Sequence, residues 1–341
     1  MVSTGKAVAS PCEGADLASL VVIRCCPKRP GVQPGNQSEF ATQFAATRFE
    51  RSLSAVKPDT VVIPGGTALL GTAKSVIHFD SEAPLRYVPV ASFLMSRATI
   101  TNVQFAAFVA DTGYVTEAEH LGWSFVFHDQ VPSYIRDTQA VPGAGWWRKV
   151  DGANWQRITG PRCSLVQELP DHPVVHVSWN DAQAYCSWIG GRLPTEAQWE
   201  HAARGALGDV RFPWGNVEPD DVHNLLCNIW QGNFPHANSV ADGYRTTAPA
   251  VSFGVNGYGL YNMVGNVWEW THETFSGAAQ RIPASQPASF KVAKGGSFLC
   301  HKSYCYRYRI AARIGNTSDS STTHMGFRVV WDIDGETCPS A

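Results

Sequence analysis

Two closely spaced cysteines are the residues of this chain whose types and spacing best suit chemistry. Cys300 and Cys305 lie five positions apart in the string GGSFLCHKSYCYRYR. Thiolate sulfur is a soft ligand that selects Cu(I) or Zn(II), and a thiolate pair suits Cu(I), which accepts low coordination numbers. A zinc site requires four ligands, and the chain has no C-x-x-C pair that would complete one. The spacing leaves two other interpretations open: a redox disulfide, or two unrelated buried cysteines.

Oxygen donors gather in a second string, NGYGLYNMVGNVWEW, at residues 256–270. There the side chains of Asn262 and Glu269 bracket the backbone carbonyls of Gly265 and Val267. Hard oxygen ligands suit calcium, although the string lacks the EF-hand pattern and a structural turn remains an alternative.

A third string, CNIWQGNFPHANSVADGYRTTAP, offers further oxygen donors at Asn228 and Asp242. His172 and His176 indicate less, because Pro173 between them favours an extended chain, in which residues four apart are widely separated. The chain has no G-x-S-x-G, no G-K-[ST] phosphate loop and no H-E-x-x-H. Common hydrolase and nucleotide-binding functions therefore have no motif to support them.

Helices are expected at three places that flank these strings. The first begins after Thr101, a good N-cap residue, and ends at Gly113, with apolar residues at helical spacing between them. The second spans 180–189 and stops at a Gly-Gly pair. The third begins after Pro194 with Thr195 as its cap.

Strands and irregular chain account for the rest of the sequence. Alternating apolar residues predict strands within 59–66 and 87–95. Residues 206–330 are rich in Gly, Asn, Trp and Tyr and show few periodic runs, so something besides hydrogen-bonded ladders, such as bound metal, must hold them. Residues 1–57 show no sustained period and are expected to be a poorly ordered extension.

Composition limits the possible partners and location of the chain. Lys and Arg number 27 against 29 Asp and Glu, for a net charge of -2, which predicts neither nucleic-acid binding nor an anionic-membrane surface. No apolar run approaches the roughly 20 residues that span a bilayer. The nine cysteines are an odd number without disulfide spacing, which favours a reducing compartment, and we expect the cytoplasm.

Together these strings resemble the sulfatase-modifying factor family, the formylglycine-generating enzymes. The resemblance runs from about residue 59 to 330 and is carried by VVIPGG, TNVQFAAFVADTGYVTEAE, WSFVF, DHPVVHVSWNDAQAYCSWIGGRLPTEAQWE, FPWGN, NIWQG, NGYGLYNMVGNVWEW, GGSFLCHKSYCYRYR and GFRVV. It implies an α+β, C-type-lectin-like fold with short twisted sheets and few helices. The catalytic domain would span 58–332, followed by a tail at 333–341.

The resemblance also implies an activity for the cysteine pair. In the family, the positions of Cys300 and Cys305 hold one Cu(I), and the substrate cysteine joins as a third thiolate. The copper uses O2 to remove hydrogen from the substrate's β-carbon, and the thioaldehyde hydrolyses to formylglycine. Ser297, His301 and Trp268 match family positions that line the site. The substrate would be an unfolded sulfatase segment that contains Cys-x-Pro-x-Arg.

Calcium and substrate contacts are implied in the same way. One calcium ion would take the oxygens of one string and a second ion those of the other; the residues are Asn228, Ile229 (carbonyl), Asp242 and Tyr244 (carbonyl) for one, and Asn262, Gly265 (carbonyl), Val267 (carbonyl) and Glu269 for the other. The candidates for substrate contact are Trp146, Trp147, Trp155, Arg313, Ser321 and His324. For the three tryptophans, packing in the core is an equal alternative.

The chain departs from secreted members of the family at their disulfide positions. Of the four cysteines concerned it keeps only Cys186, which with Cys163 and Cys227 is expected to be a buried thiol. The departure favours a cytoplasmic, bacterial-type enzyme, and we expect a monomer. Two alternatives remain: a noncatalytic binding module on the same scaffold, and a nonhaem-iron sulfoxide synthase, which would need a further helical domain.

Overall fold

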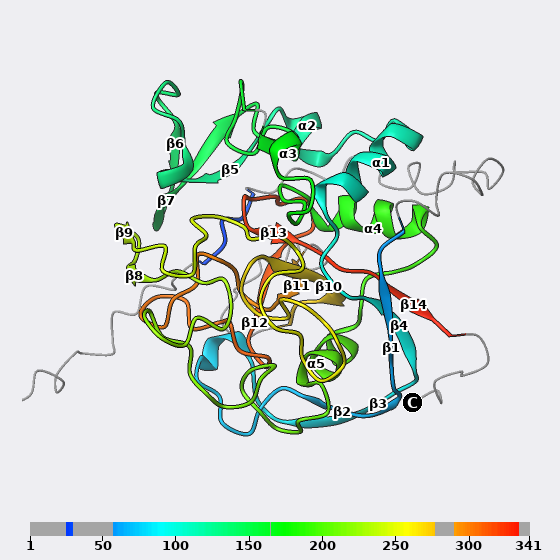
Figure 1. Cartoon of the computed structure of the whole chain (residues 1–341). Coiled ribbons are helices and arrows are strands. Elements are labelled where there is room, and N and C mark those ends of the chain that lie inside the picture. Colours follow the sequence, from blue (N-terminus) through cyan, green and yellow to red (C-terminus); the bar gives the residue numbers. More distant parts are fainter. Residues whose placement is uncertain (1–24, 30–56, 164, 277–289, 334–341) are drawn as a thin grey trace, which may run out of the picture.

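Four strands near the centre of the molecule form the sheet on which the site is built (Figure 1). The computed structural model describes residues 25–29, 57–163, 165–276 and 290–333. The sheet order is β12-β11-β10-β13, in which β13 runs parallel to β10 and the other pairs are antiparallel. The strands are β10 (Trp268–Thr274), β11 (Phe290–Lys294), β12 (Arg313–Thr317) and β13 (Met325–Gly326).

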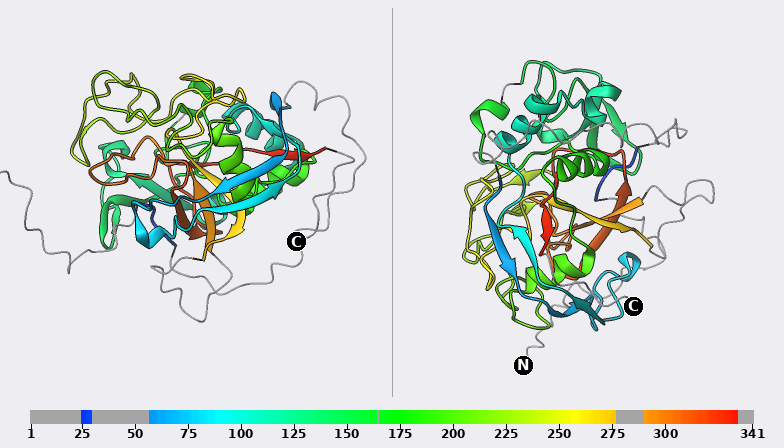
Figure 2. Two further views of the ribbon diagram at one scale, coloured as in Figure 1. Left: turned by 90° about the horizontal axis from the view of Figure 1, so that it is seen from below. Right: turned by 90° about the vertical axis from the view of Figure 1, so that its right-hand side faces the viewer.

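A second sheet joins the start of the domain to its end. Its order is β1-β4-β14, all antiparallel, with β1 at Thr60–Ile63, β4 at Phe93–Ser96 and β14 at Val330–Asp332. Figure 2 shows this sheet beside the central one, with the irregular chain between α5 and β10 gathered on one side of the molecule. The first and last strands of the described domain, β1 and β14, therefore lie in the same sheet on either side of β4.

Short elements complete the α+β fold that the sequence predicts. Three small sheets pair β2 with β3, β8 with β9, and β5 and β6 with β7. These elements are β2 (Gly66–Leu70), β3 (Arg86–Val90), β5 (Trp123–Phe127), β6 (Gln139–Val141), β7 (Ala144–Asp151), β8 (Gly232–Asn233), β9 (Ala237–Asn238), α2 (Glu117–Leu121), α3 (Leu165–Glu168) and the 3-10 turns η3 (His78–Asp80) and η4 (His128–Gln130). The strand expected within 87–95 is in fact two, β3 and β4.

The three predicted helices are confirmed, and their ends follow local capping chemistry. The first, α1 (Asn102–Thr112), begins at Thr101, whose hydroxyl accepts from the backbone N–H of Gln104, and ends at Gly113 in the left-handed conformation. The third, α5 (Glu196–Arg204), has the same capping box at its N-terminus.

The second helix, α4, spans Trp179–Trp188 and begins one residue earlier than predicted. Its N-cap is Ser178, whose hydroxyl accepts from the N–H of Asp181 while the Asp181 carboxylate accepts from Ser178 N–H. No helix in the described residues is long and apolar enough to cross a membrane.

A buried ion pair joins the central sheet to the C-terminal strand region. Arg328 donates to both oxygens of Glu269, each at 2.7 Å, and Trp199 Nε1 donates to the same carboxylate. Both charged side chains are almost fully buried. The pair fixes β10 against α5 and the chain that leads into β14.

Candidate active site

Cys300 and Cys305 lie together in the core as free thiols. Their Sγ atoms are 2.8 Å apart, which is longer than the ~2.05 Å of a disulfide bond, and both residues are fully buried. The loop between them closes because the N–H groups of Tyr304 and Cys305 both donate to the carbonyl of His301. This turn explains how residues five apart in the sequence present their sulfurs to one point.

A third sulfur, from Cys25, completes the cluster. Cys25 Sγ lies 3.0 Å from Cys305 Sγ, and the sulfurs of Cys25, Cys300 and Cys305 lie within 4.8 Å of one another. Figure 1 shows the short blue segment 25–29 beside β13, inside the molecule. The sequence analysis placed Cys25 in a poorly ordered extension; the rest of that extension, 1–24 and 30–56, and the tail 334–341 lie outside the described residues.

The three thiols do not ionise equally. Hydrogen bonds, led by one with Cys26, hold the pKa of the Cys25 thiol well below its ordinary value. Burial raises the pKa of Cys300 and of Cys305 well above theirs. A thiolate at Cys25 is therefore stabilised by neighbouring S–H groups, while like charge discourages a second one. The nearest guanidinium, Arg307, has Nη1 4.0 Å from Cys305 Sγ.

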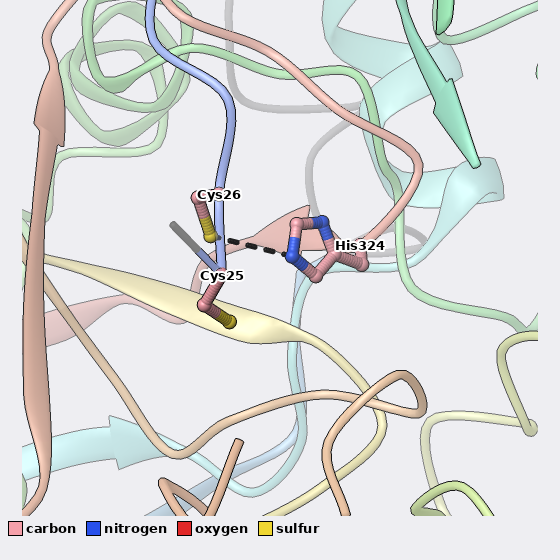
Figure 3. Close-up of side chains that lie close together, drawn as sticks. All are labelled: Cys25, Cys26 and His324. Carbon is pink, nitrogen blue, oxygen red and sulfur yellow. Dashed lines mark hydrogen bonds between the residues drawn. The ribbon is translucent and has the colours of Figure 1, made fainter. Parts of the chain in front are cut away.

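The neighbour of Cys25 contacts a predicted site residue. Cys26 Sγ lies 3.3 Å from Nε2 of His324, whose Nδ1 lies 2.6 Å from the hydroxyl of Thr322 (Figure 3). Burial lowers the pKa of His324, so its imidazole is neutral. The centroid of the His324 ring lies 4.6 Å from that of Trp147 with the two rings tilted, and Trp147 Nε1 donates to the carbonyl of Cys25 at 3.1 Å.

Residues 27–29 are held in the same way as Cys25 and Cys26. The hydroxyl of Ser320 donates to the Pro27 carbonyl at 3.1 Å. Arg29 donates from Nη2 to the hydroxyl of Ser321 at 2.9 Å and lies over the Trp123 ring at 4.8 Å. The predicted substrate-contact residues Trp147, Ser321 and His324 thus all contact the segment 25–29.

Ser321 is joined through the hydroxyl of Ser124 to the imidazole of His176. Ser321 Oγ lies 2.7 Å from Ser124 Oγ, which lies 2.7 Å from Nδ1 of His176. His176 Nε2 lies 2.7 Å from the carbonyl of Ile158, which can only accept, so the proton is on Nε2 and Nδ1 accepts. Burial lowers the pKa of His176 to about 3, which keeps it neutral. Ser124 has one hydroxyl proton and two acceptors for it, His176 Nδ1 and the Ser321 carbonyl at 3.0 Å. Ser321 can donate its own hydroxyl proton to Ser124 Oγ while its oxygen accepts from Arg29.

The structure places the other predicted site residues near the cysteines. The N–H of Ser297 donates to Cys300 Sγ at 3.4 Å, and Ser297 is fully buried. His301 Nδ1 lies 2.7 Å from the Ser303 hydroxyl, and its Nε2 is 3.3 Å from Asp221. Trp268 is buried at the start of β10, where its backbone N–H donates to the carbonyl of His324.

Three predicted contact residues take other partners. Trp146 packs edge-on against Tyr304 and Phe234, within an aromatic cluster beside the cysteine loop. Trp155 is buried against Phe105 of α1, so the core alternative describes it. Arg313 forms an ion pair with Glu196 of α5 at 2.7 Å.

The first set of predicted calcium ligands lies close together. The side-chain amide of Gln231 donates both to the Ile229 carbonyl and, at 2.9 Å, to Asp242, and the Tyr244 N–H donates to the same carboxylate. Asn228 donates from Nδ2 to the carbonyl of Thr246, and its buried Oδ1 has no hydrogen-bond partner among the described residues.

The second set is divided. Asn262 resembles Asn228: Nδ2 donates to the Ala250 carbonyl, and within the described part of the chain the buried Oδ1 has no hydrogen-bond partner. Glu269, in contrast, has both oxygens engaged by Arg328. A buried amide oxygen without a hydrogen-bond partner can serve as a ligand for a hard cation. Asn228 and Asn262 are therefore the residues of these two strings that best fit calcium.

Comparison with known proteins agrees with the geometry. The model of the sulfatase-modifying factor enzyme 1-like domain matches residues 45–333. The chain belongs to the sulfatase-modifying factor family. It is 51% identical over 294 residues to a formylglycine-generating enzyme of Thermomonospora curvata, covering 83% of this chain and 96% of that one. It is 48% identical over 324 residues to the Bos taurus formylglycine-generating enzyme, covering 90% and 84%.

The family also contains an inactive relative, and its fold is shared more widely. A Mus musculus protein named inactive C-alpha-formylglycine-generating enzyme 2 is 42% identical over 274 residues, covering 80% of this chain and 85% of that one. Among solved structures, PvdO from Pseudomonas aeruginosa aligns with a TM-score of 0.54 at 22% identity, covering 80% of this chain and 94% of that one. That likeness confirms the fold alone.

Family membership makes one overlooked signal in the sequence readable. Residues 25–29 are Cys-Cys-Pro-Lys-Arg, which has the Cys-x-Pro-x-Arg spacing expected of a substrate. Composition and periodicity could not reveal it, because five residues carry no period. A search of the chain for the substrate motif would have found it. Arg307, which lies beside Cys305, was not predicted as a site residue. Its only signal in the sequence is the alternation of tyrosine and arginine around it.

Proposed function

We propose that this chain is a copper-dependent oxidase that uses O2 to convert the cysteine of a Cys-x-Pro-x-Arg segment in an unfolded sulfatase to formylglycine. The observation that carries the proposal is the buried Cys300–Cys305 pair, with sulfurs 2.8 Å apart and a third cysteine sulfur 3.0 Å from Cys305. Two thiols fixed by the protein and one that arrives on a Cys-x-Pro-x-Arg segment form the ligand set expected for Cu(I).

The donor set fits the proposed metal. Cys300 and Cys305 would hold the copper, and a bound Cu(I) with sulfur ligands supplies the electron that starts O2 reduction. A zinc ion would require a fourth ligand besides the three sulfurs of Cys25, Cys300 and Cys305. Cys26 and His324 form a separate group with Cys25.

The protein's own residues position the substrate and exclude water. Trp147 binds the carbonyl of the reacting cysteine, Ser320 the carbonyl of the proline, and Ser321 the guanidinium of the arginine. Full burial of both metal-site cysteines keeps solvent from the sulfur cluster. The Ser321 contact would recognise the arginine side chain, and the two carbonyl contacts would set the register of the segment.

We also propose two calcium ions of structural function. Support comes from the unpartnered buried oxygens of Asn228 and Asn262, and from Gln231, which gathers Ile229 and Asp242. We propose a monomer, and a reducing compartment agrees with the free state of the described cysteines. Cys186 and Cys227 are buried thiols as expected, whereas Cys163 is only half-buried.

The test is aerobic incubation of the copper-loaded protein with a sulfatase-derived peptide, followed by mass spectrometry for an aldehyde in place of the thiol. Cys300→Ser and Cys305→Ser are expected to abolish conversion, since each removes one of two protein ligands. Cys186→Ala is the matched control, because this thiol is equally buried but lies in α4, away from the sulfur cluster. Unchanged turnover in Cys300→Ser protein would remove the proposal.

The noncatalytic alternative is favoured only by the inactive relative at 42% identity. It predicts stoichiometric binding of the peptide without oxygen consumption. An iron enzyme predicts iron rather than copper in the purified protein, which metal analysis measures directly.

A further inference from the structure

We infer that Cys25 is a substrate of the chain that carries it, so that the protein converts its own Cys25 to formylglycine. The inference rests on the proposed function and adds a modification site to it. Its basis is the position of the segment 25–29, which lies where a sulfatase segment would have to bind and carries the same residue spacing.

Three separate contacts hold the segment in one register. Trp147 Nε1 donates to the Cys25 carbonyl at 3.1 Å, Ser320 Oγ donates to the Pro27 carbonyl at 3.1 Å, and Arg29 donates to Ser321 at 2.9 Å. Two of these bonds read the backbone and one reads a side chain. Because they are spread from the first to the last residue of the motif, a shift by one position would break all three.

The buried arginine is compensated in part. Arg29 is only 4% exposed, and a buried cation requires compensation. Burial lowers the pKa of Arg29, and its Nε and Nη1 have no hydrogen-bond partner among the described residues. The face of Trp123, the Ser321 hydroxyl and the charges of Asp319, Glu117 and Asp181 offset part of this cost.

The thiol of Cys25 is placed for reaction as well as for binding. Its sulfur lies 3.0 Å from Cys305 Sγ, within the group of three that could hold one metal ion, and it is not bonded to either partner. Cys26, the other thiol of the segment, instead faces His324 on the opposite side (Figure 3). The positions of the two thiols therefore predict that Cys25 is modified and that Cys26 is not, so Cys26 serves as an internal control.

The reaction balances with dioxygen as the oxidant and two external thiols as the reductant. The Cys25 side chain loses its C–S bond and one C–H bond, and gains a C=O bond. Sulfur leaves as hydrogen sulfide. The two electrons from Cys25 and the two from the external thiols, which become a disulfide, reduce O2 to two molecules of water. One water molecule hydrolyses the thioaldehyde, so the aldehyde oxygen comes from water. The product has no sulfur at residue 25, so it cannot complete the metal site, and an external segment can take its place.

The first experiment uses the full chain, loaded with copper, under air with a thiol reductant and a sulfatase peptide in the same tube. Mass spectrometry after aminooxy labelling reads the aldehyde on both the peptide and residue 25. The expected result is an aldehyde at residue 25 that is lost in Cys25→Ser and Cys300→Ser protein but retained in Cys26→Ser protein. Conversion of the peptide while Cys25 stays a thiol overturns this inference and leaves the proposed function. Conversion of neither removes the proposed function, and the inference with it.

The second experiment needs no copper. The metal-free full chain is treated with iodoacetamide, and the alkylation of Cys25 is followed by mass spectrometry. Docking is expected to slow alkylation by roughly 10-fold relative to Arg29→Ala protein, because the thiol reacts only when the segment is released. Equal rates in the two proteins would show that the segment is not held at the site, and would overturn the inference.

Discussion

The Sγ atoms of Cys25 and Cys305 lie 3.0 Å apart although 280 positions separate the two residues in the chain. The protein thus brings a segment from its N-terminal region to the cysteine loop near its C-terminus. Cys300 completes the cluster at 2.8 Å from Cys305. The position of the segment 25–29 therefore brings three sulfurs to one point.

Removal of the Ser321 hydroxyl is expected to weaken recognition of the substrate arginine. A hydrogen bond to a charged group contributes about 1.5 kcal/mol, so Ser321→Ala should raise the KM for a Cys-x-Pro-x-Arg peptide by roughly 10-fold with little change in kcat. Steady-state kinetics with a second peptide, in which methionine replaces the arginine, provides the control. The account is contradicted if the variant loses as much against that peptide.

The neutral His176 predicts a loss of stability in acid. Burial lowers its pKa from 6.5 to about 3 in the folded protein. The contribution of neutral His176 to the free energy of unfolding is fully present above pH 6.5 and is lost as the pH falls toward about 3, because the unfolded chain binds the proton first. The free energy of unfolding then falls by at most about 1.4 kcal/mol per pH unit. Urea unfolding at pH 7 and pH 5 measures the loss.

His176→Asn protein tests the assignment of that loss. Asparagine tolerates the left-handed backbone at this position, where φ is 59°, and does not titrate. The difference in unfolding free energy between the two pH values should be smaller in this variant than in the unchanged protein. An identical difference would mean that the acid sensitivity comes from other groups.

Removing one side of the buried Arg328–Glu269 pair should be costly. Arg328→Met leaves Glu269 with an uncompensated charge in the core, for which the expected loss in unfolding free energy is about 3–5 kcal/mol. Arg245→Met is the matched control, since Arg245 pairs with Asp129 at the surface and such a pair contributes at most about 1 kcal/mol. Chemical denaturation of both variants gives the comparison, and similar losses would speak against a structural role for burial here.

Calcium should stabilise the fold through Asn228 and Asn262. An ion present at about 100 times its dissociation constant adds about 2.7 kcal/mol, so a chelator should lower the Tm by on the order of 5 °C. Asn262→Ala should reduce that shift. Asn102→Ala is the control, because Asn102 also has a buried unpartnered oxygen but lies outside both calcium strings. A chelator that leaves the Tm unchanged would contradict the assignment.

Sequence reasoning reached the parts of the molecule that local chemistry determines. The Thr101 and Thr195 caps and the Gly113 stop follow from hydrogen bonds within a few residues, so the helices could be predicted. The proximity of Cys300 and Cys305 was also within reach, because a single turn closes their loop.

The parts that sequence reasoning did not reach depend on contacts across the chain. Cys25 was assigned to an extension without structure, and only its distant partners Trp147 and Ser320 show why the segment is held. Trp155 could not be separated from Trp147 by composition, yet one packs against α1 and the other contacts the segment. The break between β3 and β4 has no alternation signal.

X-ray absorption at the copper edge of the full chain, loaded with Cu(I) in the absence of O2 and without added peptide, tests most directly whether these cysteines share one metal. The account predicts coordination by sulfur alone, with three sulfur ligands per copper that fall to two in Cys25→Ser protein and are disrupted in Cys300→Ser protein. Coordination dominated by nitrogen or oxygen, or a sulfur count that does not change in either variant, would contradict it.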